Sequence, residues 1–182
     1  MNDVLARVRA LHTLWQRGVA DLSAEQANHV EREGVLPIAF TLVHYVRGED
    51  ANAIDVLDAK GLLWDEHAPR FGHEGIIPAR GSALADAERV RIRDMDAWRA
   101  YQSAVFARTE RLLASATGEL LDRVMFDGQR PPSLKGGFLD AYVPEGPIRR
   151  RNAIEAWFFQ HGSRHLGELE HARALVGLGG LT

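Results

Sequence analysis

His161 and His165 are four residues apart in a stretch that the sequence predicts to be helical. Four residues advance the azimuth of an α-helix by roughly 400°, so the two rings lie about 40° apart, one turn above the other. Two neutral imidazoles in this arrangement can bind one zinc, nickel, copper or iron ion. Glu168, on the same face, could accept the second ring N–H of a ligand histidine or contact a metal-bound water.

A histidine pair alone is weak evidence for a metal site. A shuffled chain with 8 histidines in 182 residues contains roughly 0.3 pairs at this spacing. The alternative is a helix with two half-buried or solvated histidines. His44, on another predicted helix and beside small residues, is the candidate third ligand. A lone histidine in such a helix more often hydrogen-bonds within the core, so both interpretations stay open on these residues.

The composition excludes several classes of protein. A chain of 182 residues, 46% hydrophobic and 26% charged, suits a single globular domain spanning residues 1–182. The net charge of −3 argues against a general nucleic-acid binder. The first residues lack the basic and apolar regions of a signal peptide, and no apolar run is long enough for a membrane span. We therefore expect a cytoplasmic protein with no nucleic-acid or membrane partner.

The chain has no cysteine. This excludes disulfide bonds, a thiolate metal site and a cysteine nucleophile. Any metal must be held by histidine, carboxylate or backbone groups, and any thiol chemistry must use a thiol brought from outside. No Gly-x-Ser-x-Gly elbow, P-loop or Rossmann fingerprint is present.

Four long segments carry apolar residues at helical spacing. Pro37 and Pro147 each suit the first turn of a helix, and Asp94 suits an N-cap. Ser23 and Gln26 have the spacing of a capping box, which predicts a short helical turn. No run of residues predicts a strand convincingly. The sequence therefore predicts an all-α four-helix bundle, with helices over about 2–20, 36–60, 95–117 and 147–176.

Long connections join the second helix to the third and the third to the fourth. Residues 61–93 are punctuated by Gly and Pro, with a short helix expected between 83 and 93. This segment is either a lid or wall of a pocket or a long surface connection. Residues 126–147 form the second connection. Arg149–Arg151 is expected to be a solvated helix start, or, near a pocket mouth, to attract an anionic ligand.

At this point the chain resembles the DinB-like family, also described as the DinB/YfiT-like metalloenzymes. One shared feature is a histidine early in the second helix followed by an acidic residue, here His44 and Glu49. Another is the late His-x-x-x-His-x-Gly-Glu motif, here residues 161–168, and the last is the ending Leu-Val-Gly at 175–177. The resemblance covers most of the chain, from the first helix to about Gly180.

The resemblance implies a four-helix bundle in up-down-down-up order and a homodimer. It implies that three histidines, by position His44, His161 and His165, bind a divalent ion, often zinc or nickel. Relatives with assigned activity use a low-molecular-weight thiol: they are bacillithiol or mycothiol S-transferases and a mycothiol-dependent maleylpyruvate isomerase. The connection between the second and third helices is long here, so the shape of the family's pocket does not transfer.

Three neutral histidines would leave coordination positions of the ion open, as in catalytic zinc sites. The leading hypothesis is a metal-dependent enzyme that transfers a small thiol to a small-molecule electrophile, or uses the thiol for an isomerisation. Glu168 would support a ligand histidine, and Glu49 is a weaker candidate for that role. The alternatives are a hydrolase that activates water at the ion and a non-catalytic metal- or ligand-binding stress-response protein.

Overall fold

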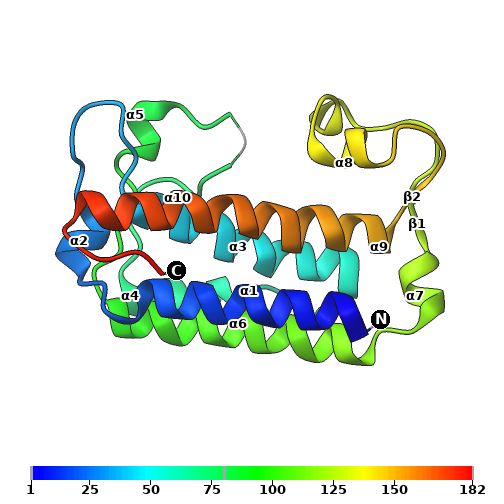
Figure 1. Cartoon of the computed structure of the whole chain (residues 1–182), viewed down its shortest axis with the longest axis horizontal. Helices are drawn as coiled ribbons and strands as arrows, with labels where there is room; N and C mark the ends of the chain where they lie inside the picture. The colour runs from blue at the N-terminus through cyan, green and yellow to red at the C-terminus, as the bar shows by residue number, and fades with distance from the viewer. Residues whose placement is uncertain (1, 80, 182) are drawn as a thin grey trace.

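The computed structural model of the chain describes residues 2–79 and 81–181. Its long helices form a four-helix bundle, with α1 and the last helical run parallel to each other and α3 and α6 running the opposite way (Figure 1). Helix α1 packs against α6 and α10, and α10 also packs against α3. This confirms the all-α bundle and gives it the up-down-down-up order. The long elements are α1 (Asn2–Ala20), α3 (Ile38–Leu57), α6 (Met95–Ser115) and a run made of α9 (Arg150–Ala153), η2 (Ile154–Gln160) and α10 (His161–Leu175).

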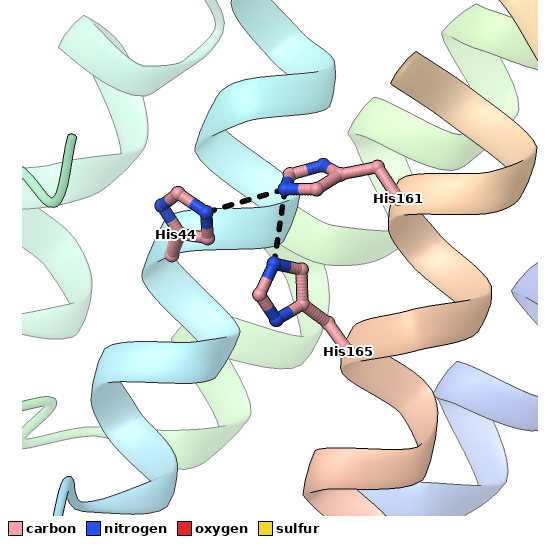
Figure 2. A group of neighbouring side chains, drawn as sticks. All are labelled: His44, His161 and His165. Carbon is pink, nitrogen blue, oxygen red and sulfur yellow. Dashed lines mark hydrogen bonds between the residues drawn. The ribbon is translucent and has the colours of Figure 1, made fainter. Parts of the chain in front are cut away.

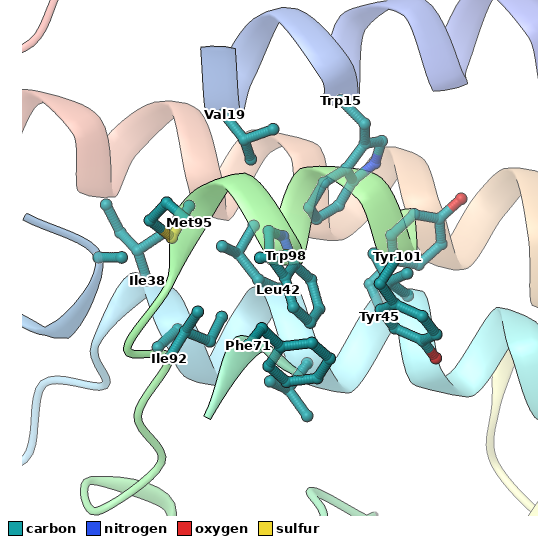
Figure 3. Close-up of a cluster of buried hydrophobic side chains, with 14 of the residues drawn as sticks. Trp15, Val19, Ile38, Leu42, Tyr45, Phe71, Ile92, Met95, Trp98 and Tyr101 are labelled. Atoms are coloured by element: carbon teal, nitrogen blue, oxygen red, sulfur yellow. The ribbon is translucent and has the colours of Figure 1, made fainter. Parts of the chain in front are cut away.

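The centre of the bundle is aromatic (Figure 3). Trp15 of α1 stacks on Tyr45 of α3 with their ring centroids 4.4 Å apart. Phe71 packs edge-on against Trp98 of α6, with a centroid separation of 5.2 Å. All four of these side chains are fully buried. No helix in the described part of the chain is long and apolar enough to cross a membrane.

The helix starts agree with the sequence at two sites and differ at two. Asp94 accepts hydrogen bonds from the backbone N–H groups of Asp96 and Ala97, so it is the N-cap of α6. Ser23 forms the expected capping box with Gln26 before α2 (Ala24–Asn28). Pro37, in contrast, is the N-cap of α3 and precedes its first turn. Helix α9 begins at Arg150 instead of Pro147, because the chain first forms a short strand.

The two long connections contain structure that the sequence did not predict. Strands β1 (Val124–Phe126) and β2 (Ile148–Arg149) pair antiparallel and form a small ribbon beside the all-α bundle. Strands of two or three residues are too short to show an alternating apolar pattern. The expected short helix near 83–93 is α5 (Leu84–Ala87). The remaining elements are α4 (Trp64–Phe71), α7 (Gly118–Asp122), the 3-10 turn η1 (Pro132–Leu134) and α8 (Phe138–Tyr142).

A buried carboxylate anchors the first connection to the bundle. Asp50 of α3 is fully buried and accepts hydrogen bonds from the backbone N–H groups of Leu63 and Trp64, at the start of α4. Tyr101 also donates its hydroxyl proton to Asp50, and Arg108 forms an ion pair with it. Because a buried charge is tolerated only when it is paired and hydrogen-bonded, these contacts fix where α4 begins.

The arginine run serves the second connection. Arg150 is buried and its guanidinium lies 2.7 Å from Asp58, just beyond the end of α3. Arg151 forms an ion pair with Asp122, and Arg149 donates to the backbone carbonyl of the same residue. These arginines hold α7 and the two-stranded ribbon against the bundle. The expectation of a solvated helix start is therefore wrong for Arg150, which is buried, and right for Arg151, which is exposed.

The packing around Gly162 gives the first testable prediction. A Cβ atom at Gly162 would lie 2.5 Å from the Tyr45 hydroxyl oxygen and 2.7 Å from a Leu11 methyl carbon, whereas Gly167 of the same helix has nothing within 4 Å. We expect Gly162→Ala to lower the free energy of unfolding by about 1–3 kcal/mol through overpacking. Gly167→Ala, the matched control, should raise it by about 0.5–1 kcal/mol. Urea unfolding followed by circular dichroism measures both, and equal stability of the two variants would contradict the packing argument.

Candidate metal centre

Three histidines from two helices meet at one point (Figure 2). His44 comes from the first half of α3, and His161 and His165 come from the first two turns of α10. The Nε2 atom of His161 lies 3.2 Å from Nε2 of His44 and 2.9 Å from Nε2 of His165. One nitrogen from each ring falls in a group whose members all lie within 4.8 Å of one another. The structure therefore brings together the three residues that the sequence singled out.

The spacing of the nitrogens fits a shared metal ion. Two nitrogens that are each about 2.0–2.1 Å from one ion, at tetrahedral or octahedral angles, lie about 2.8–3.4 Å apart. The two Nε2 separations, 3.2 and 2.9 Å, fall in this interval. Three ring nitrogens facing one another repel through their lone pairs unless a proton or a cation lies between them. The three histidines could thus hold a metal ion.

The electrostatic environment keeps these rings neutral. Burial, helped by the neighbouring histidines and Arg164, lowers the pKa of His161 to about 3. Burial also lowers the pKa of His165 to about 3, again with contributions from His44 and Arg164. The pKa of His44 is lowered by burial as well, and the Pro78 carbonyl opposes this effect. Since only neutral imidazole binds a metal, all three rings are in the ligating form near neutral pH.

Glu168 lies where its carboxylate can accept a hydrogen bond from the His165 ring. Its Oε2 atom is 2.6 Å from Nδ1 of His165, while Nε2 of the same ring faces the other histidines. A proton held on Nδ1 by the carboxylate leaves the Nε2 lone pair free for an ion. The side chain of Glu168 is half exposed.

Glu49 does not contact the histidine cluster, although the sequence made it a weaker candidate for supporting a ligand histidine. It is fully buried, accepts a hydrogen bond from the Tyr45 hydroxyl at 2.8 Å, and lies 3.2 Å from Nε2 of His12. No direct contact joins it to His44, His161 or His165 in the described contacts. It therefore belongs to the interior of the bundle, next to the histidine cluster.

His12 completes this buried chain of polar groups. Its Nδ1 lies 2.9 Å from Glu110, and its ring stacks on Phe106 at 3.9 Å. Burial alone would lower the pKa of His12, but the charges and hydrogen bonds of Glu49 and Glu110 outweigh it, and the pKa is raised. Burial likewise opposes ionisation of Glu49, yet His12 holds the pKa of that carboxyl below its usual value. The pair is an ionised contact inside the core.

The helix that carries His161 starts in an unusual form. Residues Ile154–Gln160 make a π-helix, which runs directly into α10. Such wide turns are rare and occur often at functional sites. They shift the residues that follow around the helix axis. Trp157, Gln160 and His161 line the same pocket. Nothing in the apolar pattern of the sequence distinguishes this segment from an ordinary helix.

The histidines face an open pocket of about 880 Å³. The two long connections form its sides and rise from the same face of the bundle (Figure 1). The first side includes Ala79, Gly81 and Leu84, so residues 61–93 do supply a wall of the pocket. Leu134 and Phe138 belong to the second side. Arg164, which the sequence analysis did not single out, also lines the pocket, although its place inside the His-x-x-x-His motif was a usable signal.

Comparison with known proteins supports the fold. No protein-family model matches the chain. No curated protein matches it in sequence either. The structure is similar to a crystal structure described as that of a conserved protein from Enterococcus faecalis, with a TM-score of 0.73 and 17% sequence identity. The match covers 96% of this chain and 95% of the other, and at this identity it shows a common helical fold and nothing about activity.

The raised pKa of His12 predicts a pH-dependent contribution to stability. Because the folded pKa lies above the unfolded value of 6.5, the contribution is full below pH 6.5 and is lost as the pH rises through the folded pKa. We expect His12→Gln to lower the free energy of unfolding more at about pH 6 than at about pH 9. His29→Gln, which removes an exposed histidine 3.1 Å from Glu31, is the control and should change little at either pH. An equal loss for His12→Gln at both values would contradict the ionised pair.

Proposed function

We propose that the protein is a divalent-metal-dependent enzyme of the DinB-like kind, with His44, His161 and His165 as the ligands. The observation that carries the proposal is the meeting of three neutral imidazoles at the wall of a large open pocket. A structural zinc site is closed by four protein ligands, whereas a catalytic site has three and leaves a position for water or substrate. The late His-x-x-x-His-x-Gly-Glu motif supports the same assignment.

The residues around the centre have separable roles in this proposal. When bound, the ion supplies Lewis-acid chemistry that lowers the pKa of a coordinated thiol or water. Glu168 holds the proton on Nδ1 of His165, which keeps Nε2 available as a ligand and fixes the ring. The apolar side chains of Phe40 and Trp157 line the same pocket and limit access of water to the reacting groups.

We further propose that a low-molecular-weight thiol is the co-substrate and that the ion is zinc or nickel. The chain has no cysteine, so a sulfur nucleophile must come from outside. A pocket of about 880 Å³ is near the upper end of ordinary ligand sites and has room for a thiol and a second small reactant. The reaction would be transfer of the thiol to an electrophile, or an isomerisation that passes through a thiol adduct.

The metal ligands can be tested by elemental analysis of protein dialysed against zinc or nickel. We expect about one ion per chain in the wild type and a loss of bound ion in His161→Ala. His171→Ala removes an exposed histidine of the same helix and should retain the ion. Glu168→Gln should bind the ion about 10–100-fold more weakly, because it weakens the hydrogen bond to His165. Equal metal content in His161→Ala and His171→Ala would refute the ligand assignment.

The need for a thiol co-substrate can be tested by leaving the thiol out of the assay. Metal-loaded protein should consume an electrophile such as 1-chloro-2,4-dinitrobenzene faster than the uncatalysed rate only when bacillithiol, mycothiol or another small thiol is present. The rate should fall to background in His161→Ala and persist in His171→Ala. Turnover of an ester or amide without any thiol would support a hydrolase instead. Metal binding without turnover of either type would support a non-catalytic binding protein.

A further inference from the structure

Arg164 stands out among the groups near the histidines because it is a cation beside a candidate cation site. Its guanidinium nitrogen lies 2.9 Å from Nε2 of His165 and can donate a hydrogen bond to that atom. Its carboxylate neighbour on the helix, Glu168, is 3.9 Å away. The Arg164 side chain is 57% exposed and lines the pocket.

An ion and Arg164 cannot both use the same lone pair. Nε2 of His165 is the atom that faces the other two histidines, so a bound ion takes the place of the guanidinium N–H there. A guanidinium is a cation, and two cations close together in a partly buried pocket repel each other. Glu168 offers limited compensation, because its other oxygen is engaged at 2.6 Å by His165. Arg164 is therefore left with free N–H donors that face the pocket.

An anionic group on the substrate would satisfy these donors and reduce the repulsion. A guanidinium presents paired N–H groups that match the two oxygens of a carboxylate. Phe40, Leu84, Leu134 and Phe138 also line the pocket and give part of it an apolar surface that suits an apolar body. Among the described lining residues, Arg164 and Glu168 are the charged ones, and the three histidines are neutral.

We propose that the substrate is a small apolar carboxylate whose carboxylate group binds Arg164 next to the metal centre. The proposal rests on the function proposed above and adds to it the chemical class of the substrate. Arg164 is assigned to substrate binding and selectivity, and the three histidines to the ion. A carboxylate is favoured over a phosphate because a single arginine supplies the positive charge among the described lining residues apart from the ion itself.

The test measures binding of benzoate and of its neutral analogue benzamide by titration calorimetry on the zinc-loaded protein. Arg164→Gln should weaken benzoate binding about 10–100-fold, the usual effect of losing a charge-assisted hydrogen-bonded pair, and leave benzamide unchanged. The control is Arg70→Gln. Arg70 forms a similar exposed pair with a carboxylate one turn away, Glu66, on α4 and outside the pocket lining, so its loss should change neither affinity.

Zinc binding gives a second readout that does not depend on turnover. By thermodynamic linkage, benzoate should tighten zinc binding in the wild type by the same factor by which zinc tightens benzoate binding, and this coupling should shrink in Arg164→Gln. Equal benzoate affinities of wild type and Arg164→Gln, or equal affinities of the wild type for benzoate and benzamide, would overturn the proposal. Tighter Arg164-dependent binding of phenyl phosphate than of benzoate would overturn the choice of a carboxylate.

The zinc content of each sample separates the two proposals. If the wild type holds no zinc, the metal-dependent function fails, and benzoate binding is then compared in the metal-free proteins. Arg164-dependent binding there would support the carboxylate site alone. Full zinc occupancy with no preference for benzoate over benzamide would reject the carboxylate site and leave the metal centre intact.

Discussion

The close approach of α10 to α1 and α3 at Gly162 sets the geometry of the whole site. The Tyr45 hydroxyl and a Leu11 methyl group fill the space that a side chain would need, and the Trp15 indole donates to the Gly162 carbonyl at 3.2 Å. This contact fixes both the height and the rotation of α10. His161 directly precedes Gly162, and His44 directly precedes Tyr45, so the same contact places rings from both helices. Backbone packing, more than side-chain flexibility, decides where the nitrogens meet.

Helix α3 holds two titratable groups in opposite states. His44 faces the pocket, where burial lowers its pKa and keeps it neutral. Glu49, five residues later, faces the interior, where the protonated His12 holds its pKa down and keeps it ionised. A buried negative charge one layer beneath three neutral rings favours positive charge at the cluster, since Glu49 opposes the fall in the pKa of His161. The bundle thus separates a neutral histidine cluster from an ionised pair by little more than one helical turn.

The features that depend on apolar periodicity and on residue type could be predicted from the sequence. Those that depend on local backbone geometry could not. Four amphipathic stripes were enough for the bundle, and Asp94 and Ser23 were readable as caps because their side chains act on the next turn. The convergence of His44 with the late pair was predictable from antiparallel helix packing and from the late His-x-x-x-His-x-Gly-Glu motif. The π-helix before His161 and the two-residue strand at Ile148–Arg149 leave no periodic signal. Arg164 was missed because a charged residue in a helix is ordinarily solvated, and its role depends on the pocket beside it.

The size of the core bears on what an ion at this centre would be for. Small metal-stabilised domains need the ion because they bury too little apolar surface to fold alone. Here tightly packed aromatic side chains, Trp15, Tyr45, Phe71, Trp98 and Tyr101, fill the bundle independently of the histidines. The histidine cluster lies at the edge of that core, on the wall of a pocket that two long connections enclose. Folding therefore need not depend on an ion at this centre, and an ion on the pocket wall would lie where a bound molecule could reach it.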